Sequence, residues 1–550
     1  MRALALVLLL ALPAAAASGD PTFDAMSREM ARSMTRLKQD EFGAPYFMAY
    51  RVIDERYWEA AASYGSMISE GEDHSRSLFV EARYGSRTLD NTDLGFQGWH
   101  GPGGFDPKVL REHLWLLTDG AYKNAVSSFL EKKARRATEF VPEALDDFTL
   151  EKPAVAERPS GSDAFDYARG RALAERLSAV FQRYPEVYDS RVVVQLRWAR
   201  RYLLTSEGTR LDTPAEEVPD MVRVAAMTRA EDGMRIDNHH AWTVRSLADL
   251  PPDDVLLRET EQVARELSDE RQAPVQAPIA APAILDQEFT GVLFHEALGH
   301  KLEGQRQRDP QQSQVFRDLV GKRIIPADIS LLDDPTMTDF KGEPLHGAYE
   351  FDSEGVPASR VVLVDHGVLE NFLMSRWPVH GFSSSNGHGR ADSQARPTGR
   401  MANLVVRADA PVPRAELTRK LVALARKAGK PYGFLLVGAF GGENPNSRDA
   451  AQTLEVRPRL VYRVDAKTGA QTLVRGVTMV GTPLVVLNRI VAAADDASLA
   501  NGFHCGAESG WVPVDQIAPS VLVSEIELQR QPEDRARPPI LPSPFHESGK

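Results

Sequence analysis

Residues 291–300 read Gly-Val-Leu-Phe-His-Glu-Ala-Leu-Gly-His, an apolar run that leads into two histidines around a carboxylate. Imidazole nitrogens are common ligands of divalent metals, and a carboxylate beside them can take a proton from water. The common zinc-protease helix reads H-E-x-x-H, with its histidines four positions apart on one face. His295 and His300 are five positions apart. The stretch therefore predicts a metal site on a helix of unusual geometry.

Five residues of a regular α-helix advance by about 500°, which would place the second ring roughly 140° away from the first. Both rings can bind one ion only if the helix bulges or ends between them. A single π-turn would bring positions i and i+5 to one face, and Gly299 is the residue that best tolerates such a distortion. The alternative is a pair of unrelated surface histidines on an ordinary helix.

Cys505 is the only cysteine of the chain and is followed by a glycine. A single cysteine cannot form an intramolecular disulfide. One interpretation is a small buried apolar residue, which is how a free cysteine usually behaves. The other is a thiolate that completes a His-His-Cys set, with the fourth position open for water. The residues by themselves leave both interpretations open.

The sequence HEALGHKLEG at 295–304 resembles the signature of the TldD/PmbA family of metallopeptidases. The resemblance covers nearly all of 285–530 and continues, in the expected order, through Asp352–Pro357, Arg400–Asn403, Phe440–Gly442, Cys505-Gly506 and Val521–Leu528. In that family the paired histidines and a distant C-terminal cysteine bind the metal. The inactive partner branch lacks these ligands, so this chain resembles the catalytic branch.

The resemblance implies that His295, His300 and Cys505 hold one divalent metal ion and that Glu296 is the catalytic general base. Zinc is the default ion because it suits mixed nitrogen and sulfur ligands. The implied activity is hydrolysis of peptide bonds in small or unfolded peptides. The implied assembly is a dimer, formed either by two copies or with a TldE/PmbA-like partner.

In the expected reaction, Glu296 takes a proton from water and then hands it to the departing amine. The peptide could lie as an added strand along a sheet edge, close to Gly441-Gly442, although a β-bulge explains these glycines more simply. Two other functions remain open. One is a non-catalytic metal-binding partner protein, and the other is an amidase that acts on a non-peptide amide such as cell-wall fragments.

Several further residues are candidate ligands with simpler interpretations. Glu303 reads more readily as a surface charge than as a ligand. His504 neighbours Cys505, and adjacent residues of a strand point to opposite faces, so only one of the two should face the ion. The other histidines read as surface or core residues at His346, His380 and His388, and as a solvated loop at His239-His240.

The beginning of the chain reads as a secretory signal peptide over residues 1–18. Met1-Arg2 precedes an apolar run from Ala3 to Leu12, and a small-residue stretch follows at Ala14–Ser18. The apolar run is too short to span a bilayer. The sequence therefore predicts a periplasmic or secreted protein that is not a membrane protein.

Composition agrees with a globular enzyme of two or three domains. The chain has 550 residues, of which 43% are hydrophobic and 26% charged. A net charge of −12 gives no sign of an electrostatic search for nucleic acid. With one cysteine, stability must come from the core rather than from disulfides.

The predicted fold class is α+β. Pro274, Pro278 and Pro282 punctuate the chain before a short apolar segment, which places a domain boundary there. The predicted divisions are the signal peptide, an N-terminal α+β domain over 19–283, a C-terminal metallopeptidase domain over 284–530 and a proline-rich tail over 531–550.

Hydrophobic periodicity predicts the elements of each half. In the N-terminal half we expect helices over 22–39, 106–136, 163–183 and 253–267, and strands over 46–53, 59–66, 77–84, 190–196, 201–205 and 221–228. In the C-terminal half we expect the motif helix capped by Asp286, helices over 414–428 and 481–493, and strands over 361–364, 368–373, 403–406, 433–437, 453–463, 472–475 and 521–529. Many strands with few helices predict a curved or barrel-like sheet with the motif helix laid against it.

Overall fold

The computed structural model describes residues 19–38, 41–92, 98–138, 145–215, 219–309, 312, 314–443, 453–531, 536–539, 541 and 543–544, without the side chains of Asn501 and Phe503. The signal peptide predicted over 1–18 lies outside the described residues, as does most of the predicted tail. None of the described helices has the length and apolar character needed to cross a bilayer.

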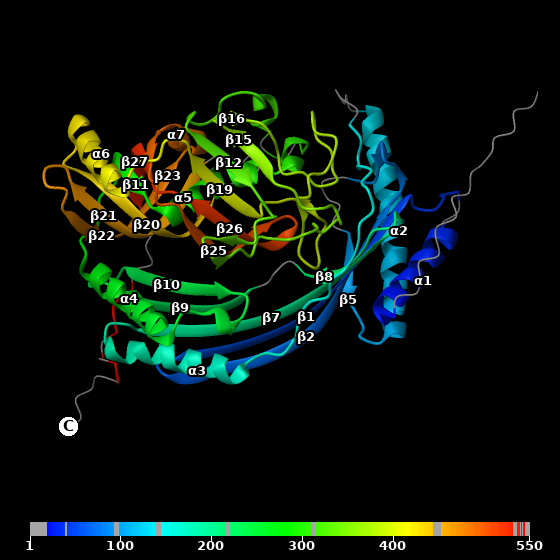
Figure 1. Ribbon diagram of the computed structural model, residues 1–550, viewed down its shortest axis with the longest axis horizontal. Coiled ribbons are helices and arrows are strands. Elements are labelled where there is room, and N and C mark those ends of the chain that lie inside the picture. Colours follow the sequence, from blue (N-terminus) through cyan, green and yellow to red (C-terminus); the bar gives the residue numbers. More distant parts are fainter. Residues whose placement is uncertain are drawn as a thin grey trace, which may run out of the picture.

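The N-terminal half is built on a mostly antiparallel sheet of long, curved strands (Figure 1). Its order is β10-β9-β7-β1-β2-β5, with β8 beside β7 and β6 beside β8. The strands are β1 (Phe47–Ser63), β2 (Ser66–Arg83), β5 (Trp99–Pro102), β6 (Val155–Glu157), β7 (Asp189–Thr205), β8 (Arg210–Pro214), β9 (Asp220–Arg229) and β10 (Arg235–Val244). A small ladder pairs β3 (Gly85–Ser86) with β4 (Leu89–Asp90).

Two breaks that the sequence predicts within long strands do not occur. The predicted strands 46–53 and 59–66 are one strand, β1, and 190–196 and 201–205 are likewise one strand, β7. The charged residues that suggest a break are satisfied across the sheet, because Arg56 pairs with Glu72 of β2 at 2.5 Å and Arg200 pairs with Asp212 of β8 at 2.6 Å. Cross-strand ion pairs of this kind let a polar stretch continue as a strand.

Four helices flank this sheet: α1 (Pro21–Arg36), α2 (Pro107–Thr138), α3 (Tyr167–Ser178) and α4 (Asp253–Gln272). α3 and α4 cover one face, while α1 and α2 lie at the opposite end of the molecule (Figure 1). On β7, Val192, Val194 and Leu196 are buried in the core that includes Leu177 of α3 and Val263 of α4. The alternate residues of β7 therefore point toward the C-terminal half.

The His239-His240 pair, predicted as a solvated loop, lies in strand β10. His239 and His240 are half-buried and stand opposite Ala225 and Val224 of β9. The prediction is wrong because polar residues alternate with buried ones along β10, a pattern that a half-exposed strand allows.

Two sheets form the C-terminal half. In the first, β11, β20, β21, β23 and β27 pair in a closed ring that makes a small barrel, with β22 and β24 at its margin. The second has the order β16-β15-β12-β19-β26-β25. The first contains β11 (Ile279–Leu285), β20 (Tyr432–Glu443), β21 (Leu454–Asp465), β22 (Gln471–Val474), β23 (Val477–Gly481), β24 (Ile490–Ala493) and β27 (Val521–Arg530). The second contains β12 (Ile329–Asp333), β15 (Val361–Asp365), β16 (Val368–Leu369), β19 (Asn403–Ala408), β25 (Ser498–Ala507) and β26 (Gly510–Ala518).

The helices of this half are α5 (Gln287–Phe294), α6 (Arg414–Lys427) and α7 (Pro483–Asn488). Short ladders join β13 (Asp339–Phe340) to β14 (Glu343–Pro344) and β17 (Gly389–Arg390) to β18 (Thr398–Gly399). The helix predicted over 481–493 is wrong in its second part, because residues 490–493 form strand β24 against β27. That part is extended because the barrel offers it a pairing partner, which local periodicity does not register.

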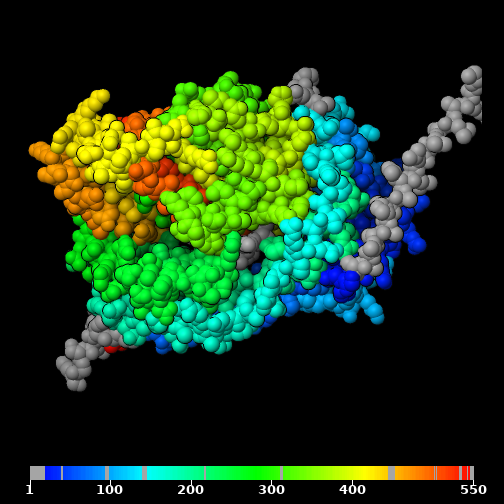
Figure 2. Space-filling model, viewed as in Figure 1, coloured from blue at the N-terminus to red at the C-terminus, as the bar shows by residue number. Residues whose placement is uncertain are grey.

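The predicted α+β class with a barrel-like C-terminal sheet is confirmed. The motif helix α5 lies between the two C-terminal sheets, and its apolar residues belong to the core that both sheets share. Strand β11 crosses the predicted boundary between residues 283 and 284. In the space-filling view, N-terminal residues in blue and cyan wrap one end of the molecule and run along its lower side (Figure 2).

Candidate metal centre

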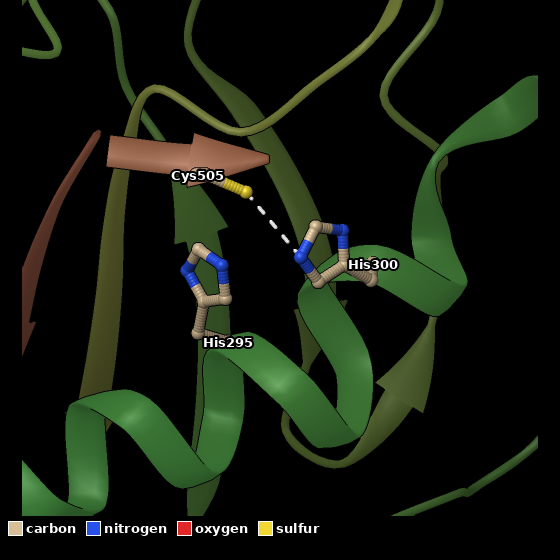
Figure 3. A group of neighbouring side chains, drawn as sticks. All are labelled: His295, His300 and Cys505. Carbon is tan, nitrogen blue, oxygen red and sulfur yellow. Dashed lines mark hydrogen bonds between the residues drawn. The ribbon is translucent and has the colours of Figure 1, made fainter. Parts of the chain in front are cut away.

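The helix that carries the paired histidines has a capped start and a distorted end. The Asp286 carboxylate accepts a hydrogen bond from the Phe289 backbone N–H at 2.8 Å, as expected of an N-cap. After α5 the backbone forms a π-turn over 295–299, in which the His300 N–H donates to the His295 carbonyl. The two rings meet edge to face, with centroids 4.8 Å apart (Figure 3). The π-turn inferred from the five-residue spacing is confirmed.

Gly299 is required by packing as well as by the distortion. A Cβ at this position would lie 2.0 Å from the Sδ atom of Met401, which is fully buried. The side chain of Met401 therefore fills the space directly against the backbone of the π-turn. No larger residue fits at position 299 without moving that methionine.

Strand β25 brings Cys505 to the two histidines. Its Sγ atom is 3.3 Å from Nε2 of His300. One ligand atom from each of His295, His300 and Cys505 lies within 4.8 Å of the others, and all three residues are buried. Figure 3 shows the sulfur and both rings turned toward a common space. Within the described residues, no other group of three or more His, Cys, Asp or Glu side chains is arranged to hold an ion.

The three side chains suit a metal ion. Ligands arranged as a tetrahedron around zinc, at bonds of about 2.0–2.3 Å, are separated from one another by about 3.3–3.8 Å. The 3.3 Å separation of Cys505 Sγ and His300 Nε2 already falls in this range. Two imidazoles and a thiol are also the donor types that zinc prefers.

Glu303 orients the ring of His300. Its Oε1 atom is 2.9 Å from Nδ1 of His300, and the carboxylate is fully buried between Arg306 (Nε at 2.8 Å) and Arg400 (Nε at 3.3 Å). Burial raises the pKa of Glu303, but Arg306 and His300 outweigh it and hold this pKa at about 2. An ionised Glu303 accepts the Nδ1 proton and leaves Nε2 for a metal.

The expectation that Glu303 is a surface charge is wrong. The chain turns into short 3₁₀ segments at His300–Leu302 and Gly304–Gln307, which folds the carboxylate inward beneath the histidine. Two buried arginines compensate the charge, and this is the condition under which a carboxylate can be buried at all. Arg400 also donates to the Cys505 carbonyl at 2.5 Å, so it links both ligand-bearing segments.

Gln516 of strand β26 orients the other imidazole. Its side-chain amide nitrogen lies 3.1 Å from Nδ1 of His295. The amide oxygen of Gln516 is buried without a hydrogen-bond partner among the described residues. A half-turn of this amide would let its oxygen accept the Nδ1 proton, which leaves Nε2 of His295 bare for a metal.

The electrostatics of the cluster favour a thiolate. Burial alone would raise the pKa of Cys505, but His300, His295 and Arg400 lower it well below its usual value. The Cys505 and Glu303 charges in turn raise the pKa of His300 against the effect of burial. A lowered pKa favours the thiolate, which rather than the thiol is the form that binds metals.

Glu296, the predicted general base, lies in the π-turn at the edge of an open cleft. The cleft encloses about 1590 Å³ and is bordered by both histidines, Cys505 and the end of β20. Burial raises the pKa of Glu296, while the two neighbouring histidines oppose this effect. A raised pKa brings a carboxylate closer to the value that suits a general base near neutral pH.

Gly441 and Gly442 border the same cleft as Glu296, and Gly442 lies directly against its side chain. The register of β20 against β21 shifts between Ala439 and Gly441, and Gly441 has a φ of +130°, so the predicted β-bulge is confirmed. A Cβ at Gly442 would lie 2.7 Å from Cγ of Glu296. The bulge therefore brings bare backbone against the side chain of the predicted base.

The remaining candidate ligands lie elsewhere. His504 is exposed on the face of β25 opposite the buried Cys505. His388 is buried with Nε2 at 3.1 Å from Asp333, and His346 is buried with Nε2 at 3.3 Å from the Thr243 carbonyl. His380 is exposed. These positions agree with the surface and core interpretations.

Three residues around the ligands are absent from the sequence-based site: Arg306, Arg400 and Gln516. Arg306 follows Glu303 by three positions, a helical spacing that could have indicated a pair. Arg400 belongs to a segment that resembles the family, but no role followed from the resemblance. Gln516 has no sequence signal, because only the packing of α5 against β26 places it beside His295.

A π-turn with paired imidazoles, a remote thiolate and an adjacent carboxylate at an open cleft has the construction of a metallopeptidase site. Residues 279–530 match the family model described as the PmbA/TldA metallopeptidase C-terminal domain. The match covers somewhat less than half of the chain, and it is this C-terminal domain that belongs to the TldD/PmbA family.

Curated relatives of this chain carry metalloprotease names. A metalloprotease of Methanocaldococcus jannaschii is 29% identical over 233 residues, covering 42% of this chain and 47% of that protein. A metalloprotease TldD homologue of Haemophilus influenzae is 29% identical over 267 residues, covering 47% and 51%. A zinc metalloprotease TldD homologue of Saccharolobus solfataricus is 25% identical over 249 residues, covering 45% and 51%. The similarity thus spans about half the length of each relative.

Solved structures match almost the whole chain in fold. A Thermotoga maritima protein described as a modulator of a DNA gyrase has a TM-score of 0.63 at 14% identity, covering 92% of this chain and 99% of that one. TldE from Thermococcus kodakarensis has a TM-score of 0.59 at 13% identity, covering 92% and 100%. At these identities the likeness concerns the fold alone.

Proposed function

We propose that this protein is a metal-dependent peptidase that hydrolyses peptide bonds of small or unfolded peptides, with Glu296 as general base. The observation that carries the proposal is the contact between Cys505 and His300, which lie 205 positions apart in the chain. Both residues lie beside His295, at a cleft that Glu296 also borders. The metalloprotease names of the curated relatives support it.

His295, His300 and Cys505 would hold one divalent ion, for which we propose zinc. The mixed nitrogen and sulfur ligand set supports this choice, as does the zinc metalloprotease name of the Saccharolobus solfataricus relative. When bound, such an ion polarises a substrate carbonyl and lowers the pKa of water. Glu303 and Gln516 hold the two imidazoles so that Nε2 of each faces the ion.

Glu296 performs the proton transfers of the proposed reaction. Its carboxylate takes the proton of the attacking water and later delivers it to the nitrogen of the departing amine. Gly442 lets the backbone of β20 lie directly against Glu296, because a Cβ there would stand 2.7 Å from Cγ of Glu296. Proton transfer by a positioned side chain typically contributes about 10²–10⁴-fold to the rate.

The substrate is proposed to add a strand to β20 at Phe440–Glu443. This stretch borders the cleft and pairs with β21 along one edge. Along the other edge, β11 pairs with β20 only at residues 434–436. Further along β20, the N–H groups of Gly438 and Ala439 donate to the carboxylates of Asp286 and Glu288. Addition of a strand uses main-chain hydrogen bonds and is therefore tolerant of sequence.

We also propose that the protein is exported and works as a dimer, with a second copy or with a TldE/PmbA-like partner. The apolar segment after Met1-Arg2 supports export. The structural likeness to TldE supports a partner of the same fold.

The test combines metal analysis with peptide cleavage on the purified protein. We expect about one equivalent of zinc, which is lost in the variants His295→Ala, His300→Ala and Cys505→Ala. Glu296→Gln should keep its metal and lose at least about 10²-fold in kcat. Full metal occupancy in the cysteine variant would contradict the third ligand. Cleavage of peptidoglycan fragments, with none of unfolded peptides, would favour an amidase instead, and metal binding without any cleavage would favour a binding protein.

A further inference from the structure

A second cavity lies beside the metal cleft, between the N-terminal sheet and the hairpin of β25 and β26. It encloses about 850 Å³ and is bounded by Arg51, Arg197, Arg201, His504 and Trp511; we call it the arginine chamber. His504 and Trp511 also border the metal cleft, so the two spaces adjoin at these residues. In Figure 1, β25 and β26 lie over the face of the sheet that α3 and α4 leave uncovered.

Two of the arginines of the chamber join the halves of the molecule. Arg51 donates to the backbone carbonyls of Asp392 at 2.7 Å and Ala395 at 2.6 Å. Arg201 donates to the carbonyls of Phe351 at 2.9 Å and Asp352 at 3.2 Å. Both side chains are buried, so Arg51 and Arg201 act as structural links between the two halves of the molecule.

Arg197 is placed differently. Its guanidinium lies 4.9 Å from the ring centroid of Tyr57, on the neighbouring strand β1, and the side chain is only half-buried. Among the described residues it has no ion-pair partner within 4.0 Å, although Glu55 and Asp392 border the same chamber. Burial raises the pKa of Glu55 and the charge of Arg197 lowers it, so the two groups interact without forming an ion pair. A cationic group is therefore available to a ligand inside the chamber.

The chamber begins close to the metal ligands. His504 borders it, and Cys505 is the next residue of the same strand. Adjacent residues of a strand are about 3.3 Å apart along the chain and point to opposite faces. An extended peptide that leaves the metal cleft past Trp511 reaches the chamber within a few residues.

We propose that the arginine chamber is a subsite for a carboxylate of the substrate and that Arg197 binds it. This inference rests on the proposed peptidase function and names the substrate class: peptides that carry a carboxylate a few residues from the cleaved bond. A guanidinium matches a carboxylate with two parallel hydrogen bonds, which gives both affinity and orientation. Trp511 is 66% exposed where the cleft and the chamber adjoin. It offers an apolar surface to a substrate residue that lies between the cleaved bond and the carboxylate.

The carboxylate has two sources, the C-terminus of a short peptide or an Asp or Glu side chain. Three peptides that differ only at the C-terminus separate these sources. The first has a free C-terminus, the second has a C-terminal amide, and the third has the amide with glutamate as its last residue. For the wild-type protein we expect kcat/KM for the best carboxylate peptide to exceed that of the plain amide by roughly tenfold to a hundredfold. The carboxylate peptide that has the higher kcat/KM than the plain amide identifies the source.

Arg197→Gln should remove this preference and leave kcat/KM for the plain amide unchanged, while Arg197→Lys should keep part of it. Arg258→Gln is the matched control, because Arg258 is an exposed residue of α4 and its loss changes the net charge equally. Thermal melting checks that each variant is folded. Equal kcat/KM for all three peptides in the wild-type protein would overturn the proposal, as would an equal loss in Arg258→Gln.

A binding measurement separates this proposal from the proposed function. In the metal-loaded Glu296→Gln variant, the Kd of the same three fluorescent peptides is measured by anisotropy, without turnover. A carboxylate preference in Kd that Arg197→Gln abolishes would support the subsite even if no peptide is cleaved by the wild-type protein. A Kd that is the same for the carboxylate and amide peptides would overturn the subsite even if cleavage is observed.

Discussion

Oε1 of Glu303 lies 2.9 Å from Nδ1 of His300, and this carboxylate is buried without exposure between two arginines. The contact fixes which nitrogen of the imidazole carries the proton and which one faces Cys505. It also places a fixed negative charge behind a proposed metal ligand, which makes that imidazole more basic. The proposed metal centre thus depends on a residue that would not itself touch the ion.

Replacing Glu303 by glutamine should weaken metal binding by about tenfold to a hundredfold, because the amide lacks the charge that holds the Nδ1 proton. Competition with a chromogenic chelator measures the affinity. Glu508→Gln is the control, since the partly exposed Glu508 contacts Arg306 at 3.0 Å and, within the described part of the chain, forms no hydrogen bond or ion pair with His300. Metal affinity equal to that of the wild type in Glu303→Gln would contradict the orienting role.

Gly442→Ala should impair catalysis without removing the metal. The added Cβ would stand 2.7 Å from Cγ of Glu296, so the carboxylate must move away from the cleft. A displacement of about 1 Å in a catalytic group costs roughly 10²-fold in rate, and we expect a fall in kcat of about tenfold to a hundredfold. Peptide cleavage and metal content are measured on the same sample.

The control for this variant is Gly71→Ala, because a Cβ at Gly71 meets no atom within 4 Å. Its activity should match that of the wild-type protein. Loss of metal together with activity in Gly442→Ala would show that position 442 supports the ligands rather than the base.

Local chemistry made part of the site predictable from the sequence. The five-residue spacing of His295 and His300 predicts a π-turn from helix geometry alone, and the backbone has one. The Gly441-Gly442 pair similarly predicts a bulge. The place of Cys505, in contrast, followed only from the family resemblance, since nothing in its own neighbourhood indicates a partner 205 positions away.

The residues that the sequence did not reveal act through tertiary contacts. Glu303 reads as a surface charge because its burial depends on Arg400, which is nearly a hundred positions downstream. Gln516 reaches His295 only because β26 packs against α5. Strand β10 was missed for the same kind of reason, because its pairing with β9 rather than its composition makes it a strand.

Gly299→Ala should destabilise the fold and weaken metal binding, because its Cβ would stand 2.0 Å from Sδ of Met401. Overpacking of this kind typically costs about 1–3 kcal/mol. Met401→Ala alone should cost about 2–5 kcal/mol through the cavity it leaves. In the double variant the new methyl enters that cavity. Its loss of unfolding free energy should therefore be smaller than the sum of the losses in the two single variants. Denaturant unfolding of all four proteins measures this coupling. Simple additivity would mean that the two residues are not in contact.

Asp515 should make stability depend on pH in a defined direction. It is fully buried on β26, next to Gln516, and accepts hydrogen bonds from the backbone N–H groups of His346 and of Gly347, the latter at 3.1 Å. Burial raises the pKa of Asp515 to about 6. The unfolded chain, with an ordinary pKa of about 3.9, releases this proton first as the pH rises.

The folded state therefore holds the proton more tightly, and the stability that Asp515 contributes is fully present below about pH 4 and is lost as the pH rises through about 6. Asp515→Asn removes this titration while its amide oxygen can still accept the same N–H groups. Relative to this variant, the wild-type protein should lose up to roughly 2–3 kcal/mol of unfolding free energy between pH 4 and pH 7. Urea unfolding of both proteins at several pH values gives the difference. The difference in unfolding free energy between the two proteins could instead stay constant from pH 4 to pH 7, or shift in favour of the wild-type protein as the pH rises. Either result would mean that Asp515 is ionised in the fold and that its backbone hydrogen bonds outweigh its burial.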